Sequence, residues 1–223
     1  MRPAAAGLDR VLAGSHRTTY TARALTEFDR ETIADVPLVD GRLNFDSTRQ
    51  VCGSGTATIA LADAHGKAKA PERVGDDLAP YGNWLEVTCH VQAGRWKSST
   101  VIGRFEISAP KPTAAGSAFV GRVLRTTSEL ITMRLDDAFL GTKSEPIVGV
   151  LQSTVGRSVR AELEELLGLP VRMDADALVS ALIEYPEDRL SAAFDLVQLV
   201  GGQPFMRWDA TDGVRPNAWP APS

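Results

Sequence analysis

The period of the hydrophobic residues constrains this chain most, because it changes along the sequence from two to about 3.6. In "RLNFD" (42–46), Leu43 and Phe45 alternate with polar residues, and "GTATIALAD" (55–63) alternates in the same way. A period of two indicates strands that bury one face. In "RLSAAFDLVQLVGG" (189–202) the apolar residues instead recur three and four positions apart before two glycines, which predicts an amphipathic helix with a glycine stop. The chain is therefore expected to be a β-rich α+β protein.

The same patterns predict how the chain is divided. We expect a β-rich domain, a small α+β domain and an extended C-terminal arm, over residues 1–135, 136–216 and 217–223. In the second domain, residues 144–169 have apolar residues at roughly helical spacing, which predicts two helices or one broken helix. Residues 203–216 predict a hairpin with an Asp-Gly turn at 212–213.

Prolines and glycines mark the expected ends of the strands in the first domain. A strand over 18–28 and a turn at 29–31 precede "TIADVPLV", where Pro37 predicts either an edge strand or a break between two strands. The segment "APKPTAAGS" (109–117) is expected to be a connection, and residues 118–135 to be a strand that breaks into a helical or irregular segment.

Three further glycine-containing segments carry local predictions. "CGSGT" (52–56) lacks the lysine and the spacing of a phosphate-binding loop, so we expect a glycine bulge in a strand. Gly103 is expected to mark a second bulge, where the strand changes face. Residues 64–80, with two glycines and two prolines, predict a long exposed loop. In "LAPYGNWLEV" (78–87) the proline and the glycine predict a turn that begins the next strand.

Composition excludes several classes of protein. The net charge of −4 and the absence of a basic run argue against a nucleic-acid-binding surface. No segment approaches the roughly 20 apolar residues of a membrane span. The N-terminal residues lack the apolar core of a signal peptide, so we expect synthesis in the cytoplasm. For a cytoplasmic product, Cys52 and Cys89 are expected to be free thiols rather than a disulfide.

The chemically reactive residues form no recognisable catalytic or metal-binding pattern. The histidines His16, His65 and His90 lie in separate segments without paired spacing. The carboxylates of "RLDD" (134–137) and "AELEEL" (161–166) are expected to be solvated. We therefore predict no enzyme, no metal and no cofactor.

The four tryptophans, at positions 84, 96, 208 and 219, are too dispersed for a sugar-binding cleft. One alternative is that Trp84 and Trp96 meet across a hairpin at Ala93-Gly94. We expect both to be core or interface aromatics instead.

The order of six segments resembles that of bacteriophage tail hub proteins, the baseplate-hub-like minor tail proteins of phages of actinobacteria. The segments are "LAGSHRTTYTARAL", "VDGRLNFDSTRQVCGSGTATIALAD", "LAPYGNWLEVTCHV", "VIGRFEIS", "MRLDDAFLG" and "RLSAAFDLVQLVGGQPFMRWDATDGVRP". Leu78, Pro80, Tyr81 and Gly82 match a Leu-x-Pro-[Tyr/Phe]-Gly element of that family. A second element of that family, Gly-x-Phe-x-Ile, is matched by Gly103, Phe105 and Ile107. The order of the motifs, rather than any one of them, carries the resemblance.

The resemblance implies a β-barrel or sandwich hub domain followed by a small α+β segment. It implies a structural virion protein, made in the host cytoplasm and located at the virion tail tip, that assembles with itself into a ring, as a trimer rather than a hexamer. The ring would link the tail tube to tip or fibre proteins, with the tape-measure protein as a further partner. DNA would pass through its channel without specific binding, which the net charge of −4 permits. Longer relatives continue into further modules, which we do not expect here.

The residues expected to serve assembly, as anchors or core, are Pro80, Tyr81, Gly82, Trp84, Trp96, Gly103, Phe105 and Ile107. The 64–80 loop is expected to contact a neighbouring subunit. Two alternatives from other classes remain open. A carbohydrate- or receptor-binding β-sandwich module of the tail would need exposed aromatic side chains on one face, and a hydrolase would need a catalytic group of residues that the sequence does not offer.

Overall fold

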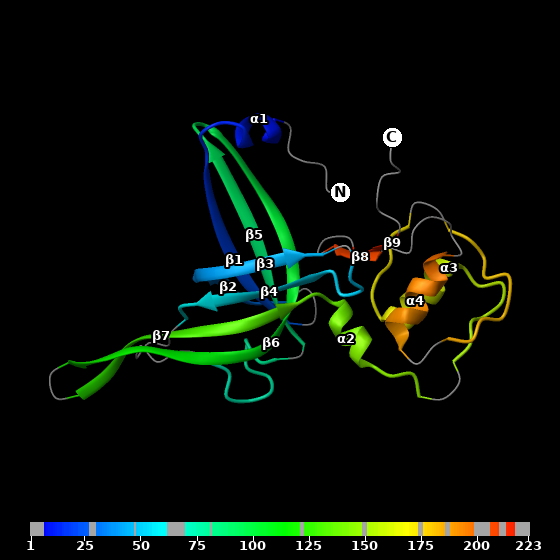
Figure 1. Ribbon diagram of the computed structural model, residues 1–223. Coiled ribbons are helices and arrows are strands. Elements are labelled where there is room, and N and C mark those ends of the chain that lie inside the picture. The colour runs from blue at the N-terminus through cyan, green and yellow to red at the C-terminus, as the bar shows by residue number, and fades with distance from the viewer. Residues whose placement is uncertain are drawn as a thin grey trace. The chain divides into compact units, whose positions relative to one another are not determined.

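The computed structural model describes residues 7–26, 30–46, 48–61, 70–80, 82–120, 123–148, 151–173, 176–185, 188–198, 206–209 and 213–216 (Figure 1). The chain forms two compact units. The first, here called the strand unit, comprises residues 2–44 and 54–136. The second, the helix unit, comprises residues 45–53 and 137–223. The 217–223 arm lies outside the described residues.

The strand unit is built from one short helix and a seven-stranded antiparallel sheet (Figure 1). Its elements are α1 (Leu8–Leu12), β1 (Arg17–Thr26), β2 (Arg30–Val36), β3 (Leu38–Phe45), β4 (Gly53–Ile59), β5 (Asn83–Ala93), β6 (Trp96–Val120) and β7 (Val123–Asp136). The strand order is β2-β1-β5-β6-β7-β4-β3. With a few helices elsewhere in the chain, this sheet confirms the β-rich α+β class.

Pro37 joins the two opposite edges of this sheet. β2 is the strand at one edge and β3 the strand at the other, and only Pro37 separates them in sequence. Two residues span at most about 7 Å, so the two edges must meet at this point. The sheet is therefore curled around its core in the manner of a barrel. The structure bears out both possibilities for Pro37: it separates two strands, and each of these is an edge strand.

Six of the strands share a single core. It contains buried residues of β1, β2, β4, β5, β6 and β7, namely Ala22, Ala24, Val36, Ala57, Ile59, Leu85, Val87, Phe105, Ile107, Ile131, Met133 and Leu135. Leu43 of β3 packs against it. The alternation of apolar residues along each strand puts this set on one face, as the period of two predicts.

The strand content of residues 109–135 is higher than predicted. The connection expected over 109–117 is part of β6, and the helical or irregular segment expected within 118–135 is β7. The two strands pair from Glu106↔Asp136 to Val120↔Val123, with register shifts after Ser108 and near Gly116. The prolines and the glycine that indicated a connection are thus accommodated in an irregular hairpin, and cross-strand pairing overrides the local signal.

The predicted 64–80 loop is only partly exposed. Residues 62–69 lie outside the described residues, but Leu78 and Ala79 are both 2% exposed and Leu78 belongs to the core of the strand unit. Val74 projects fully into solvent. The prediction of an exposed loop is therefore wrong for its C-terminal end, where the chain turns inward before β5.

The helix unit contains three helices and a two-stranded hairpin. They are α2 (Phe139–Ser144), α3 (Val159–Leu167), α4 (Arg189–Gln198), β8 (Met206–Asp209) and β9 (Gly213–Pro216). The antiparallel β8–β9 pairing and the start of β9 at Gly213, whose φ is +89°, confirm the predicted hairpin. The predicted glycine stop at 201–202 lies outside the described residues.

Only one helix forms in the segment 144–169. Ser158 caps α3 by accepting a hydrogen bond from the Ala161 N–H, and Gly168, with φ +64°, ends the helix. Among the described residues of this segment, isolated bridges form instead: Pro146 pairs with Asp188, Gln152 with Glu184 and Ser158 with Leu178. The expected second helix is thus replaced by an irregular ladder.

Candidate functional site

Most of the sequence-predicted assembly residues lie along the ladder between β5 and β6. Trp84 faces Glu106, Leu85 faces Phe105 and Val87 faces Gly103. Pro80 and Gly82 directly precede β5, and Tyr81 lies outside the described residues. The nearest residues of the two motifs, Gly82 and Gly103, are 21 positions apart in sequence, and the pairing of β5 with β6 brings the motifs close together. Phe105 and Ile107 are fully buried in the core.

The turn before β5 depends on Gly82. Its φ is +96°, a conformation that favours glycine, and its N–H donates to Oε1 of Glu106 at 3.2 Å. Asn83 is 8% exposed, and its Nδ2 donates to the carbonyl oxygens of Asp76 and Ala79 at 3.1 and 3.0 Å. These bonds hold the end of the preceding loop against the start of the strand. The turn thus determines where β5 begins.

Gly103 lies at the predicted bulge. The ladder passes from Val87↔Gly103 to Thr88↔Val101, so Ile102 is the extra residue and the bulge prediction is confirmed. The ring of Phe105 covers Gly103, where a Cβ atom would lie 2.8 Å from two ring carbons. The bulge and the close ring together explain the Gly-x-Phe spacing.

The glycines of residues 52–56 have a different role from the one predicted. β4 pairs with β7 from Ser54 to Ile59 without a register shift, so no bulge forms on that side. A Cβ atom at Gly55 would clash with the Arg42 carbonyl oxygen. The close approach of β3, rather than a bulge, requires the glycine.

Trp84 and Trp96 do not meet. Trp96 faces Ala93, nine residues along β5 from Trp84, which corresponds to about 30 Å at about 3.3 Å per residue. They also lie on opposite faces of the sheet, because Trp84 and Ala93 differ in parity along β5. Trp84 is 6% exposed, so it offers no open surface for stacking.

A buried carboxylate links three strands on the face of the sheet opposite to the core. Glu86 of β5 is 3% exposed and accepts a hydrogen bond from Nε of Arg23 and another from Nε of Arg104, both at 2.7 Å. Arg23 also pairs with Glu31 at 3.1 Å. Burial opposes the ionisation of Glu86, but the two arginines outweigh it and hold its pKa below the usual range. The sequence analysis missed this cluster; its one signal is a glutamate inside an apolar strand.

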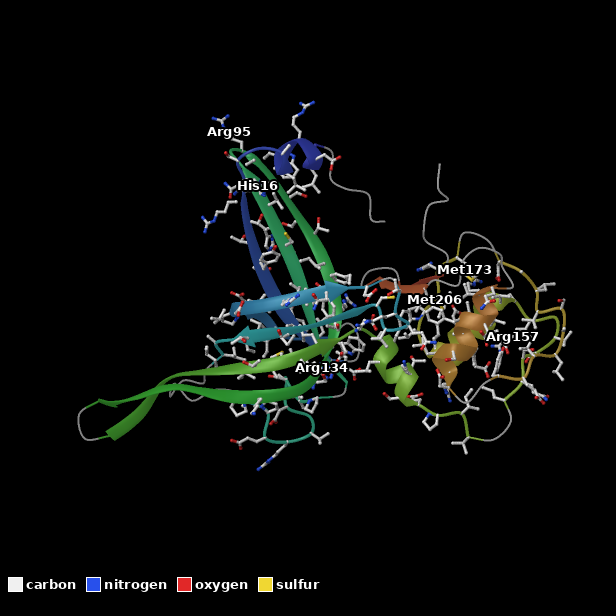
Figure 2. The ribbon with its side chains drawn as sticks, in the orientation of Figure 1. His16, Arg95, Arg134, Arg157, Met173 and Met206 are labelled. Atoms are coloured by element: carbon white, nitrogen blue, oxygen red, sulfur yellow. The ribbon has the colours of Figure 1, made fainter. Side chains whose placement is uncertain are left out.

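Glu106 and Asp136 form a second polar cluster where β6 meets β7. They face each other in the ladder, and Asp136, 1% exposed, accepts hydrogen bonds from Ser108 Oγ and pairs with Arg134 at 3.0 Å (Figure 2). Burial and the nearby Asp136 raise the pKa of Glu106, against the bond from Gly82. The prediction that the carboxylates of 134–137 are solvated is therefore wrong.

Two more carboxylates are buried in the helix unit. Asp137, 3% exposed, accepts hydrogen bonds from the N–H groups of Gly53 and Phe139, which holds the 45–53 segment beside the start of α2. Glu162, 4% exposed, accepts from the Thr154 N–H and from the Tyr185 hydroxyl at 2.8 Å. The prediction of solvated carboxylates is wrong for Glu162 as well.

Arg157 completes the Glu162 cluster by pairing with Glu162 and Glu165 (Figure 2). Burial and the bond to Glu162 raise the pKa of Tyr185, so its hydroxyl remains a donor. The cluster fastens the irregular ladder of residues 146–158 and 177–188 to α3. The carboxylates of Glu86, Asp136, Asp137 and Glu162 each bind partners within their own unit.

The cysteines and the described histidines are also engaged internally. Both cysteines are free thiols. Burial, with the nearby carboxylates of Asp137 and Asp46, raises the pKa of the Cys52 thiol to about 12, so the reactive thiolate is disfavoured. His90 hydrogen-bonds to Thr21 and Ser99, both at 2.7 Å, and so links β1, β5 and β6.

Among the residues that the structure describes, no three His, Cys, Asp or Glu side chains are grouped to hold a metal ion. Within the same residues, no helix is long and apolar enough to cross a membrane.

Comparison with protein-family models finds no match, and comparison with curated proteins finds none either. Among solved structures, the chain is similar to the 43 kDa tail protein of prophage MuSo2 from Shewanella oneidensis, with 11% sequence identity and a TM-score of 0.48. The similarity covers 88% of this chain and 51% of that tail protein, so this chain spans about half its length. At this identity and TM-score the similarity does not establish a shared function.

Proposed function

We propose that this chain is a structural, non-enzymatic protein of a bacteriophage tail. It assembles with itself into a ring at the distal end of the tail, as a trimer rather than a hexamer. The ring joins the tail tube to tip or fibre proteins and encloses the channel through which DNA leaves. The tape-measure protein is a further partner, and DNA passes without sequence-specific contacts.

One observation carries this proposal: the two motifs of the hub resemblance come together in the β5–β6 ladder of a curled sheet. Gly82 shapes the turn before β5 and contacts Glu106, and Gly103 lies under the ring of Phe105. Both motifs build the same part of the sheet, which explains why such short motifs occur in a fixed order. They build a scaffold rather than a site for a substrate.

The charged groups of the site favour a scaffold as well. Glu86 and Asp136 are almost fully buried, and each is paired with arginine. A catalytic carboxylate needs access to a substrate, which neither has. The glycan-binding alternative needs exposed aromatic platforms, and the burial of Trp84 removes one of its two candidates. The structural role is therefore the function that the geometry supports best.

Immunogold electron microscopy of intact particles from the source phage tests the location. An antibody raised against this chain is expected to label the distal end of the tail. Absence of label from particles whose antigen is shown to be accessible would refute the proposal. Native mass measurement of the purified chain tests the ring separately, since a ring gives a single multiple of the 23.9 kDa monomer.

A further inference from the structure

The β6–β7 hairpin extends well beyond the core of the strand unit (Figure 1). β5 pairs with β6 only as far as Glu106, and β4 pairs with β7 only from Ile131 onward. β6 and β7 nevertheless continue to pair with each other as far as Val120↔Val123. In the ladders of the described residues, the segments 112–120 and 123–130 each have one neighbouring strand, and we call them together the arm.

The arm therefore presents two open strand edges. In a strand, the N–H and C=O groups alternate between its two sides, so each edge carries a row of groups available to another strand. Pro110 and Pro112 lack an N–H and interrupt the beginning of the β6 edge. Residues 113–130 contain no proline, so every residue beyond that point has its N–H. A two-stranded ribbon is marginally stable in water by itself, and a further strand would stabilise it.

The strand unit also carries an open edge that suits this arm. β3 has eight residues, and among the described strands it pairs only with β4. β2 is the other edge strand, but its register against β1 shifts between Ala22 and Ala24 and again before Leu25. Such bulges twist an edge away from a partner, which disfavours β2 as the acceptor. Its Val39 is 57% exposed, which adds apolar surface beside the edge.

We propose that the arm of one copy of the chain adds to the open β3 edge of a neighbouring copy. The inference rests on the proposed ring and specifies how it is held together. The arm and the β3 edge are different surfaces, so the contact is head-to-tail, and repeated contacts of this kind close into a ring when the rotation permits. Main-chain hydrogen bonds supply the recognition, as in other cases of strand addition. The second copy is the favoured occupant because one chain supplies both a projecting hairpin and an edge strand of similar length.

The first test removes the arm and keeps the core. Because Pro112 faces Ile131, residues 113–130 can be replaced by Asn-Gly, a two-residue turn that connects two paired strands. The matched control keeps the arm and changes only its connection, with Gly121→Asn and Arg122→Gly. We expect native mass measurement to show a ring for the wild type and the control, and only monomer for the shortened chain, which should still unfold cooperatively. A ring formed by the shortened chain would overturn the arm contact.

The second test uses the unaltered chain, so it remains decisive if the shortened chain does not fold. Hydrogen exchange is compared between the ring and the dilute monomer. We expect amides in residues 38–45, 113–120 and 123–130 to exchange more than about tenfold more slowly in the ring. A ring in which these segments exchange as in the monomer overturns this inference and leaves the proposed function standing. A wild-type chain that stays monomeric at every concentration overturns the ring and the arm contact together.

Discussion

Removal of the Glu86 carboxylate should destabilise the strand unit more than removal of any of its partners. The carboxylate accepts two charge-assisted hydrogen bonds at 2.7 Å, and its side chain is 4% exposed. Each bond of this kind contributes about 1.5–3 kcal/mol. Arg104, whose side chain is 14% exposed, would be left charged and unable to reach water fully. We therefore expect Glu86→Ala to lower the free energy of unfolding by about 3–5 kcal/mol, the range for a broken buried pair.

Hydrogen exchange of the β5 amides in the full chain measures this loss, because it reports the opening of the strand unit itself. Glu31→Gln is the matched control: Glu31 also pairs with Arg23, but its side chain is 43% exposed, so the expected change is below about 1 kcal/mol. A change for Glu86→Ala as small as that of the control would refute the reasoning.

The same residue predicts a pH dependence. The folded-state pKa of Glu86 lies below its ordinary value of 4.5. Its contribution to stability is therefore fully present above about pH 4.5 and is lost as the pH falls through the folded-state pKa. We expect the difference in stability between the wild type and Glu86→Gln to shrink as the pH falls below 4.5. A difference that stays constant or grows on acidification would contradict the assigned ion pairs.

Three further substitutions test other parts of the site. Gly103→Ala should cost about 1–3 kcal/mol in urea denaturation, because the new Cβ would lie 2.8 Å from the ring of Phe105. Burial raises the pKa of Glu106, so the stability it contributes is lost as the pH rises through that pKa; Glu106→Gln should raise stability at pH 7, measured in the same way. Tyr185→Phe should destabilise the helix unit by about 1–2 kcal/mol, read from exchange of the α3 amides, because the buried Glu162 loses a donor.

Each of these has an outcome that would count against it. Gly94 has φ +57° and open space around it, so Gly94→Ala measures the cost of backbone strain alone. If Gly103→Ala lowers the free energy of unfolding by no more than Gly94→Ala does, contact with the Phe105 ring is not the reason for the glycine at position 103. Destabilisation by Glu106→Gln at neutral pH would show that the charge is favourable there. Unchanged exchange in Tyr185→Phe would mean that Glu162 does not need the hydroxyl.

Several strands of the strand unit could be predicted from the sequence, for a physical reason. Alternation along β4 reflects one buried face, and that face is needed in any sheet this strand could form. The bulge at Gly103 and the hairpin start at Gly213 could also be predicted, because both depend on local backbone geometry. The arm could not: its prolines and glycines are typical of a connection, and only pairing between β6 and β7 keeps it extended.

The burial of these carboxylates could not be predicted from the sequence, for a related reason. Glu86, Asp136 and Glu162 look like surface residues in sequence, because acidic side chains are seldom buried without partners. Their partners come from other strands or from distant loops, as Arg104 and Tyr185 illustrate. Burial of a charge is a property of the assembled cluster, so no local pattern reports it.

The sequence by itself determined most strands of the first 108 residues, the helices α3 and α4, and where several turns require glycine, since periodicity and φ preferences act over a few residues. Only the tertiary structure decided that Pro37 brings the two edges of the sheet together, that residues 45–53 belong to the helix unit, and that the arm extends with open edges. These features depend on which strands become neighbours. Hydrogen bonds between residues far apart in the chain set that choice, and a single strand is compatible with many neighbours.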